Sequence, residues 1–320
     1  MRLVKTTTLT RQNQSIFLLL FIQVLQDVVT KVLDEFCAAP TVPQPESDLT
    51  FSTGSTRLDA LLCGGIKPGT ITEIIGKSCS GKTQLCLTAA ALAASQDHGV
   101  VYLSSDGPSL VRISEILRKR GSTETQSNKA TNRITFVESI SSEQCTQLLE
   151  DVLSDLANLD LCCDLVDPGE GAGSAMVLEL IRRLKVVIVD SLALILKPEL
   201  GGSAGMSNMV KLQRVLRKLA EEADIAVIVV NTFTESREGG LKPSLGKSWY
   251  SVSDARIILE QRLTAETEHV ETEASSINDL RRSAQADRTD LNATVFTRRS
   301  GLYQNSYTSI ARGGIIDALP

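Results

Sequence analysis

Two kinds of segment alternate along most of the chain. Short runs rich in Val and Ile, several of them almost wholly apolar, are separated by longer stretches in which apolar residues recur at helical spacing. Runs that are apolar throughout are typical of parallel strands buried on both faces. We predict strands at 70–75, 100–104, 134–138, 186–191, 225–231, 255–261 and 293–299, with the clearest helices at 84–94 and 209–222. The alternation predicts an α/β fold with a mostly parallel central sheet flanked by helices.

The N-terminal segment follows a different pattern. From Leu18 to Phe36, apolar residues recur three and four positions apart, which predicts a short amphipathic helix within residues 1–37. Three basic residues and no acid occur among the first 15 positions. A mitochondrial transit segment is therefore one alternative interpretation, and a signal peptide is another, although no small-residue cleavage site follows the apolar run.

Proline content and charge mark the other boundaries. Three prolines fall within residues 38–49, where a helix cannot continue, so this stretch is interpreted as a linker. The main domain is expected to occupy residues 50–320. Inside it, residues 263–292 carry many acids and few large apolar groups, which predicts a polar insert at the surface.

Composition narrows the class of protein. The chain has 320 residues, with 33 Lys plus Arg against 38 Asp plus Glu, so its net charge of −5 argues against coating nucleic acid by bulk charge. The longest apolar run, near residues 16–25, is short of the roughly 20 residues that span a bilayer, and no membrane partner is expected. Seven scattered cysteines without a Cys-x-x-Cys spacing, and two histidines, disfavour structural zinc and fit a reducing compartment.

One motif dominates the candidate chemistry. Residues 76–83 read GKSCSGKT, a complete G-x-x-x-x-G-K-[ST] phosphate loop directly after a predicted strand and before a predicted helix. Glycines let backbone N–H groups turn toward phosphate oxygens, where the helix N-terminus adds its dipole. Lys82 can reach the β and γ phosphates and the Thr83 hydroxyl can ligate Mg²⁺. The predicted nucleotide-binding residues are Gly76, Lys77, Ser78, Cys79, Ser80, Gly81, Lys82 and Thr83.

Three polar residues at predicted strand ends are candidates for the remaining roles. Asp190 ends the apolar run KVVIVD and is expected beside the loop as the metal-side acid, with an ordinary turn as the alternative. Asp106 follows the strand ending in YLSS, where ligands of such folds collect, and is a candidate for orienting water or, alternatively, a turn residue. Asn231 closes IAVIVVN and could sense the γ phosphate and relay its loss, or simply cap the strand.

The segment around the loop resembles a known family. FSTGSTRLDALLCGGIKPGTITEIIGKSCSGKTQLCL, at residues 51–87, is similar to the entry to the ATPase core of the RecA-type recombinases. LKPSLGKSW at residues 241–249, followed by Arg256, resembles the eukaryotic paralogs of these recombinases, the delta subgroup in particular. The resemblance covers about residues 50–262 and resumes at 293–317. It implies a RecA-like P-loop ATPase core, ATP and Mg²⁺ as cofactors, and work in DNA repair and recombination in the nucleus.

The resemblance also assigns individual residues. Lys82 and Thr83 would hold the triphosphate and Mg²⁺, Asp190 the metal, and Asn231 would be the sensor. Pro243 lies where related proteins place a proline against the nucleotide of a neighbouring subunit. Recombinases also join subunits by inserting a Phe and an Ala, three residues apart, into the next core. Phe36 and Ala39 have that spacing and could make this contact, or Phe36 could simply end the apolar face of its own helix.

Two DNA loops would fall near residues 197–208 and 232–246 by the same resemblance. Their basic side chains are Lys197, Arg237 and Lys242, and nearby glutamates offset them. Because few phosphates could be neutralised, affinity for single-stranded or branched DNA should be modest and sensitive to salt.

One departure from the family concerns turnover. Active recombinases carry Glu-Gly where this chain has Asp106 and Gly107. A carboxylate shorter by one methylene sits about 1 Å back, and misplacement of that size can cost on the order of a hundredfold in rate. The sequence therefore predicts an ATP-binding accessory protein that hydrolyses ATP slowly, with DNA stimulation, and assembles with other recombinase paralogs. The alternatives are a non-hydrolysing scaffold and a P-loop small-molecule kinase, although no kinase lid pattern is recognisable.

Overall fold

The computed structural model describes most of the main domain, and from Leu49 onward the chain forms one compact unit. The described residues are 49–105, 107, 110–138, 141–161, 179–199, 202–235, 241–261, 289–298, 303–311 and 314–317. The predicted N-terminal helix lies outside them, and so do residues 38–48 of the predicted linker and residues 263–288 of the predicted polar insert. Residues 289–292, which we had placed in that insert, belong to a strand.

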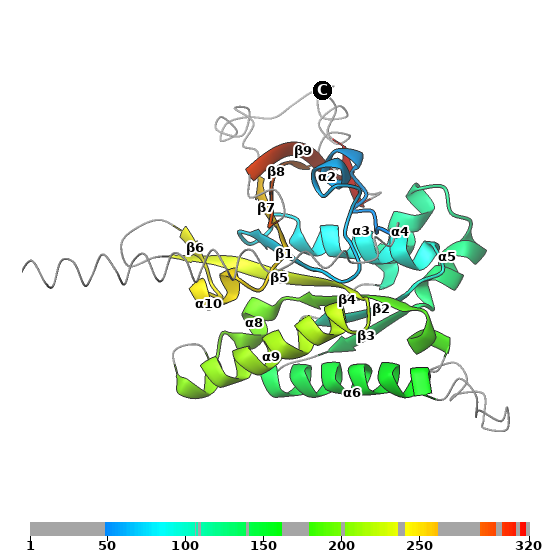
Figure 1. Cartoon of the computed structure of the whole chain (residues 1–320). Coiled ribbons are helices and arrows are strands. Elements are labelled where there is room, and N and C mark those ends of the chain that lie inside the picture. The colour runs from blue at the N-terminus through cyan, green and yellow to red at the C-terminus, as the bar shows by residue number, and fades with distance from the viewer. Residues whose placement is uncertain are drawn as a thin grey trace, which may run out of the picture. The chain divides into compact units, whose positions relative to one another are not determined.

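A single mixed sheet is the centre of the domain (Figure 1). Ten strands belong to it within the described ranges, in the order β10-β9-β8-β7-β1-β5-β4-β2-β3, with β6 paired to β5. Neighbours from β7 to β3 are parallel, whereas β7 to β10 form an antiparallel extension. The strands are β1 (Ile71–Gly76), β2 (Gly99–Ser104), β3 (Ile134–Glu138), β4 (Leu184–Asp190), β5 (Ala226–Glu235), β6 (Leu241–Pro243), β7 (Ala255–Gln261), β8 (Thr289–Thr297), β9 (Tyr303–Ala311) and β10 (Gly314–Asp317).

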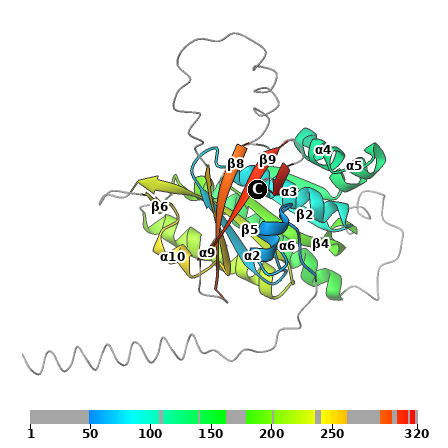
Figure 2. The same cartoon turned by 90° about the horizontal axis from the view of Figure 1, so that it is seen from above.

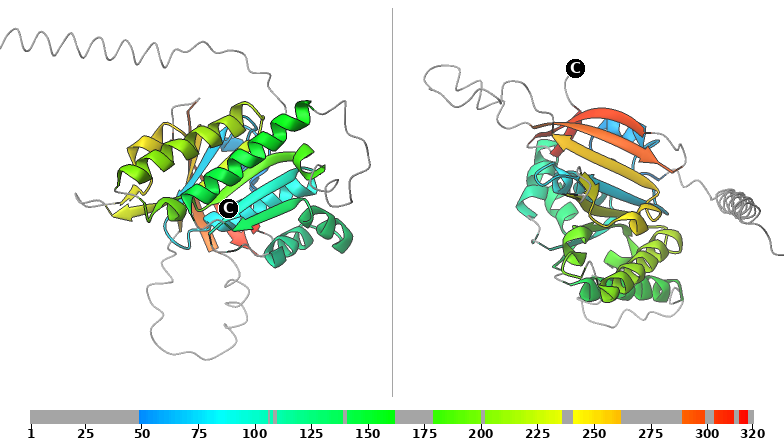
Figure 3. Two further views of the ribbon diagram at one scale, coloured as in Figure 1. Left: turned by 90° about the horizontal axis from the view of Figure 1, so that it is seen from below. Right: turned by 90° about the vertical axis from the view of Figure 1, so that its left-hand side faces the viewer.

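Helices cover both faces of the parallel strands. On one face lie α3, α4 and α5, and on the other lie α6, α8 and α9, with α6 and α9 side by side (Figures 1 and 3). Each layer encloses its own buried cluster of side chains. The helices are α2 (Thr56–Leu61), α3 (Lys82–Ser95), α4 (Leu110–Lys119), α5 (Glu124–Thr131), α6 (Ser142–Leu161), α8 (Leu192–Leu196), α9 (Ser203–Glu221) and α10 (Lys247–Tyr250). None of the helices in the described ranges has the length and apolarity needed to cross a membrane.

The composition of the strands follows from the helices that cover both faces of the sheet. Every residue of β1 and of β2 is buried, which is why these segments are mostly apolar rather than alternating, with Glu73 as a buried charged exception in β1. Nine of the 14 residues of the central helix α3 are buried, because it packs on the sheet and against α4 and α5 (Figure 2). The predicted α/β fold with a mostly parallel sheet is therefore confirmed.

The sequence-based boundaries were wrong in specific places. We expected β5 to end at Asn231, but it continues to Glu235 because its last residues pair with β6 in an antiparallel hairpin. Strands β9 and β10 and the helices α4 to α6 were not predicted. A polar side chain near a strand end was mistaken for the end itself, although backbone pairing across a hairpin sets where a strand stops.

Candidate functional site

The phosphate loop joins β1 to α3, as the motif predicted. Gly81 has φ +90° as the N-cap of α3, a backbone conformation that a side chain would strain. At Gly76 a Cβ atom would lie 2.1 Å from the Ser80 hydroxyl and 2.7 Å from the Leu259 carbonyl oxygen. Both glycines of the motif are therefore required by the geometry of the turn.

Lys82 lies over the loop. Its Nζ donates hydrogen bonds to the carbonyl oxygens of Gly76, at 2.9 Å, and Lys77, at 2.5 Å. Partial burial lowers the pKa of this ammonium, and the negative charge of Asp190 opposes that shift. Thr83, in the first turn of α3, is exposed and can present its hydroxyl outward. Lys82 and Asp190 are thus close enough to interact electrostatically, as a triphosphate–magnesium site requires.

Asp190 is the last residue of β4 and is only 8% exposed. Its strand is not a direct neighbour of β1, because β5 lies between them. The Tyr102 hydroxyl, from β2, donates a hydrogen bond of 2.8 Å to Asp190 Oδ2. Burial and the neighbouring Cys86 and Asp190 raise the pKa of Tyr102 well above its usual value, so the phenol stays protonated and acts as the donor.

Cys86, on α3, lies near the Asp190 carboxylate and the Tyr102 hydroxyl. Burial, and then the charge of Asp190, raise the pKa of its thiol well above the usual value. The thiol therefore stays neutral at physiological pH, which makes it a small packing group beside the acid rather than a nucleophile. Sequence reasoning gave Cys86 and Tyr102 no role, although a hydroxyl-bearing aromatic inside the apolar strand GVVYLS was an available signal.

A second buried polar cluster surrounds Glu73, three residues before the first residue of the loop. Glu73, on β1, is 1% exposed and accepts hydrogen bonds at both carboxylate oxygens. Asn231 Nδ2 donates to Oε1 at 2.7 Å, while Arg256 Nε and Ser253 Oγ donate to Oε2 at 2.7 and 3.2 Å. The Arg256 guanidinium also donates to Ser253 Oγ at 2.9 Å and lies 4.2 Å from the centroid of the Tyr250 ring. The ion pair is therefore buried with its hydrogen bonds satisfied.

Asn231 belongs to this cluster and is fully buried. Its Oδ1 accepts hydrogen bonds from the Thr232 backbone N–H at 2.8 Å and from Ser244 Oγ at 2.9 Å. The side chain thus connects β1, β5 and the segment after β6, and its role as a sensor stays a prediction. The next residue, Thr232, brings its hydroxyl within 3.4 Å of the Gly76 carbonyl oxygen and was not singled out from the sequence.

A residue at the end of β7 forms a hydrogen bond with the backbone of the loop. Gln261 Nε2 donates a hydrogen bond of 2.8 Å to the Cys79 carbonyl oxygen, at the point where Cys79 adopts φ +60°. The Ser80 hydroxyl is buried and lacks a hydrogen-bond partner among the residues that the structure describes. A glycine turn at a helix N-terminus, an overlying lysine, an exposed Thr83 and a nearby carboxylate fit a nucleoside triphosphate with Mg²⁺.

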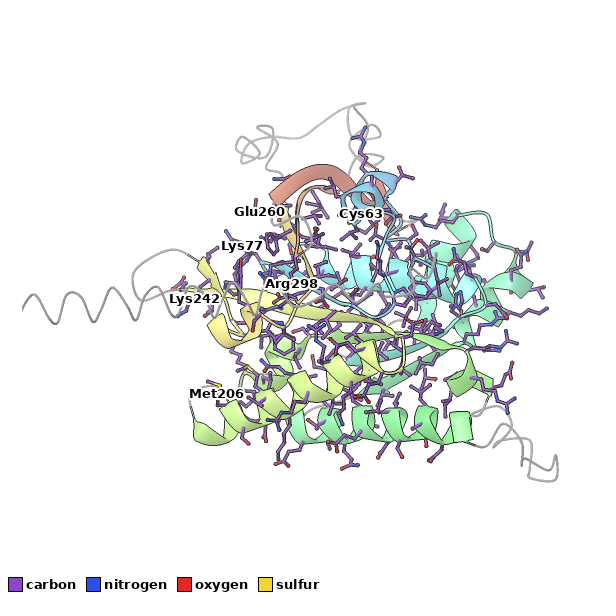
Figure 4. The ribbon with its side chains drawn as sticks, viewed as in Figure 1. Cys63, Lys77, Met206, Lys242, Glu260 and Arg298 are labelled. Carbon is purple, nitrogen blue, oxygen red and sulfur yellow. The ribbon has the colours of Figure 1, made fainter. Side chains whose placement is uncertain are left out.

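The candidate DNA loops are partly described. Lys197 and Lys242 are exposed, and Figure 4 shows Lys242 and Lys77 on the left-hand side of the molecule, with Glu260 nearby in that view. Glu199 accepts hydrogen bonds from Ser142 at 2.7 Å and Asn208 at 2.9 Å, and these bonds lower its pKa. That carboxylate therefore fastens α6 to α9 instead of simply offsetting Lys197 in solvent.

Several predicted site residues cannot be placed. Asp106, Arg237, Phe36 and Ala39 lie outside the described residues, so their assignments stay predictions. Pro243 is half-buried at the end of β6, where it pairs with Phe233 of β5, and its contact with a neighbouring subunit's nucleotide is likewise a prediction.

Comparison with known proteins finds similar sequences. A family model described as Rad51 matches residues 45–169. The protein called DNA repair protein RAD51 homolog 4 is 38% identical over 219 residues in Bos taurus, covering 67% of this chain and 62% of that relative. Its Mus musculus counterpart is 36% identical over 219 residues, covering 67% and 61%. This chain therefore matches less than two thirds of the length of either relative.

The solved structures include a similar fold. The crystal structure of the RadB recombinase superposes with a TM-score of 0.61 at 21% sequence identity, over 84% of this chain and 100% of the other. DNA repair protein RAD51 of Saccharomyces cerevisiae is 26% identical over 204 residues, covering 60% of this chain and 44% of the relative. The chain is therefore similar to the Rad51 family over residues 45–169 and to proteins named DNA repair protein RAD51 homolog 4, and it has the fold of the RadB recombinase.

Proposed function

We propose that this protein is an ATP-binding accessory protein of homologous recombination and double-strand break repair, of the delta paralog type. It acts in the nucleus, binds single-stranded or branched DNA weakly, and assembles with other recombinase paralogs to support recombinase filaments. The observation that carries the proposal is Lys82 held over a complete phosphate loop within electrostatic reach of Asp190. The similarity to proteins named DNA repair protein RAD51 homolog 4 supports the setting in DNA repair.

Different residues would bind the phosphates, hold the metal and orient the attacking water. The backbone of the loop and the Lys82 ammonium bind and orient the phosphates, while Thr83 and Asp190 would hold Mg²⁺. When bound, Mg²⁺ neutralises charge on the phosphates. Asp106 would orient the attacking water, and its short side chain predicts slow turnover. The exposed Lys197 and Lys242 offer few cations for DNA phosphates, which is consistent with weak, salt-sensitive binding.

Titration of the purified chain with ATP and Mg²⁺ tests this function. We expect calorimetric heat of binding, followed by slow release of inorganic phosphate that single-stranded DNA accelerates. Binding without any phosphate release would favour the non-hydrolysing scaffold instead. Transfer of phosphate to a small acceptor would favour the kinase. Absence of nucleotide binding by well-folded protein would contradict the proposal as a whole.

An apolar hollow supports assembly with related subunits. It has a volume of about 320 Å³ and lies between the α6 layer and the parallel sheet. Its lining comes from β2, β3 and α6, with two further residues before β4: Val101, Leu103, Thr135, Val137, Leu148, Leu149, Val152, Asp155, Leu180 and Ile181. Such a hollow fits an aromatic anchor, and a Phe carried on a neighbouring paralog is the occupant that we propose.

The Val152→Glu substitution should weaken that assembly. A carboxylate in the hollow would be desolvated by an incoming Phe, so affinity for a related paralog should fall roughly 30-fold, the loss of one anchor worth about 2 kcal/mol. Ser154→Glu adds the same charge at an exposed position of α6 and should leave affinity unchanged. Co-purification and sedimentation with the partner measure the effect. Equal affinities for the two variants would rule out the hollow as the docking site.

A further inference from the structure

The Asp190 carboxylate is held by a neighbouring strand. We propose that Tyr102 is a positioning residue, which fixes the orientation of the Asp190 carboxylate so that it can hold magnesium. This inference rests on the proposed function, because it presumes that Asp190 is the metal-side acid. It assigns a role in metal binding to a residue outside the phosphate loop motif of residues 76–83.

The topology brings the two side chains together. Strands β2 and β4 are parallel neighbours, with Tyr102 opposite Ile188 and Ser104 opposite Asp190 (Figure 1). The long tyrosine side chain spans the offset toward the carboxyl end of β4, and its hydroxyl donates to Asp190 Oδ2 at 2.8 Å. Tyr102 is 1% exposed and Asp190 is 8% exposed, so water does not readily substitute for this bond.

The tyrosine is itself firmly held. Its ring packs against the ring of Phe136, on β3, with centroids 5.2 Å apart and an interplanar angle of 48°. The rest of the ring is buried in the cluster under α3. A donor with so few alternative rotamers can define the direction of the carboxylate that it contacts.

The carboxylate needs such a constraint because its terminal torsion is soft. Rotation about the last bond of an Asp side chain has a broad profile, so an unrestrained carboxylate samples several directions. Asp190 also attracts the Lys82 ammonium electrostatically, which would draw an unrestrained carboxylate toward the lysine and away from a metal. Hydrogen-bond partners of metal ligands commonly change metal affinity by about 10- to 100-fold when they are removed.

The Tyr102→Phe substitution tests the proposal, because it removes only the hydroxyl and keeps the ring packing. We measure binding of a fluorescent ATP analogue to the full chain, first without Mg²⁺ and then across a Mg²⁺ titration. The Mg²⁺ concentration for half-maximal effect should rise about 10- to 100-fold, while affinity without Mg²⁺ should stay within about twofold. Excess Mg²⁺ should restore binding. Tyr250→Phe removes a hydroxyl from an exposed ring and should not shift the Mg²⁺ requirement.

A second variant separates positioning from a purely structural role. In an Asp190→Ala background, Tyr102→Phe should not raise the Mg²⁺ requirement further, because the group that it orients is gone. An unchanged Mg²⁺ requirement in Tyr102→Phe alone would overturn the inference, as would an equal loss of binding with and without Mg²⁺. If the wild-type chain binds no nucleotide at any Mg²⁺ concentration, the proposed function fails first, and the two failures are therefore distinguishable.

Discussion

Replacing Lys82 with Ala should reduce affinity for ATP and Mg²⁺ by about 100-fold or more. Two charge-assisted hydrogen bonds to phosphate are lost, each worth about 1.5–3 kcal/mol. Folding should be little affected, since the lysine is only partly buried and its contacts within the protein are to two loop carbonyls. Isothermal calorimetry measures the affinity, and circular dichroism shows whether the fold persists.

Lys119→Ala is the matched control for this experiment. Lys119 is exposed in the last turn of α4 and has no place in the site, so removing its charge should leave ATP affinity unchanged. An affinity loss of less than about fivefold in Lys82→Ala, below the roughly 10-fold or more that one charged hydrogen bond contributes, would show that the loop does not bind triphosphate through this lysine. Assembly with a related paralog, if it needs ATP, should be lost in parallel.

Replacing Arg256 with Ala should lower the free energy of unfolding by about 3–5 kcal/mol, because it leaves the Glu73 carboxylate buried without its cation. The Arg256 and Glu73 side chains are 5% and 1% exposed, so solvent cannot take over the role of the arginine. A loss of that size is a large fraction of the total free energy of unfolding, which is roughly 5–15 kcal/mol for a typical native protein. Urea unfolding followed by circular dichroism measures it.

Two comparisons make this prediction specific. Arg298 pairs with Asp254 but its side chain is 55% exposed, so Arg298→Ala should cost less than about 1 kcal/mol. Adding Glu73→Gln to Arg256→Ala removes the stranded charge and should recover part of the loss, a test of coupling between the two residues. Equal costs for Arg256→Ala and Arg298→Ala would mean that the buried ion pair contributes little to stability.

The parallel half of the fold and the phosphate loop could be predicted from local sequence. Strands covered on both faces are mostly apolar, and Ile71–Gly76 and Leu184–Asp190 show this in a few consecutive residues. The glycines of the loop are required because backbone segments approach each other closely there, and this requirement is recognisable in a few consecutive residues. Antiparallel strands such as β6 have a weaker sequence signal, because their pairing depends on a partner strand rather than on their own composition.

The Glu73 cluster shows where local reasoning stops. Asn231 is 158 positions from Glu73 along the chain, and Arg256 is 183 positions away, yet both donate to the same carboxylate. A charged residue inside the apolar strand ITEIIG signals that some partner must exist, since a buried charge is costly when unpaired. Nothing in the pattern of residues says which partner it is. The same holds for Tyr102 and Asp190, which come from separate strands.

By itself, the sequence determined the class of sheet, the position of the phosphate loop and the identity of its lysine, because each depends on residues close together in the chain. The tertiary structure alone decided that β5 separates the loop strand from Asp190, that Tyr102 holds this acid, and that Asn231 is enclosed in an ion-pair cluster. Strand order and side-chain pairing across a sheet come from packing between distant segments, and composition carries no record of that packing.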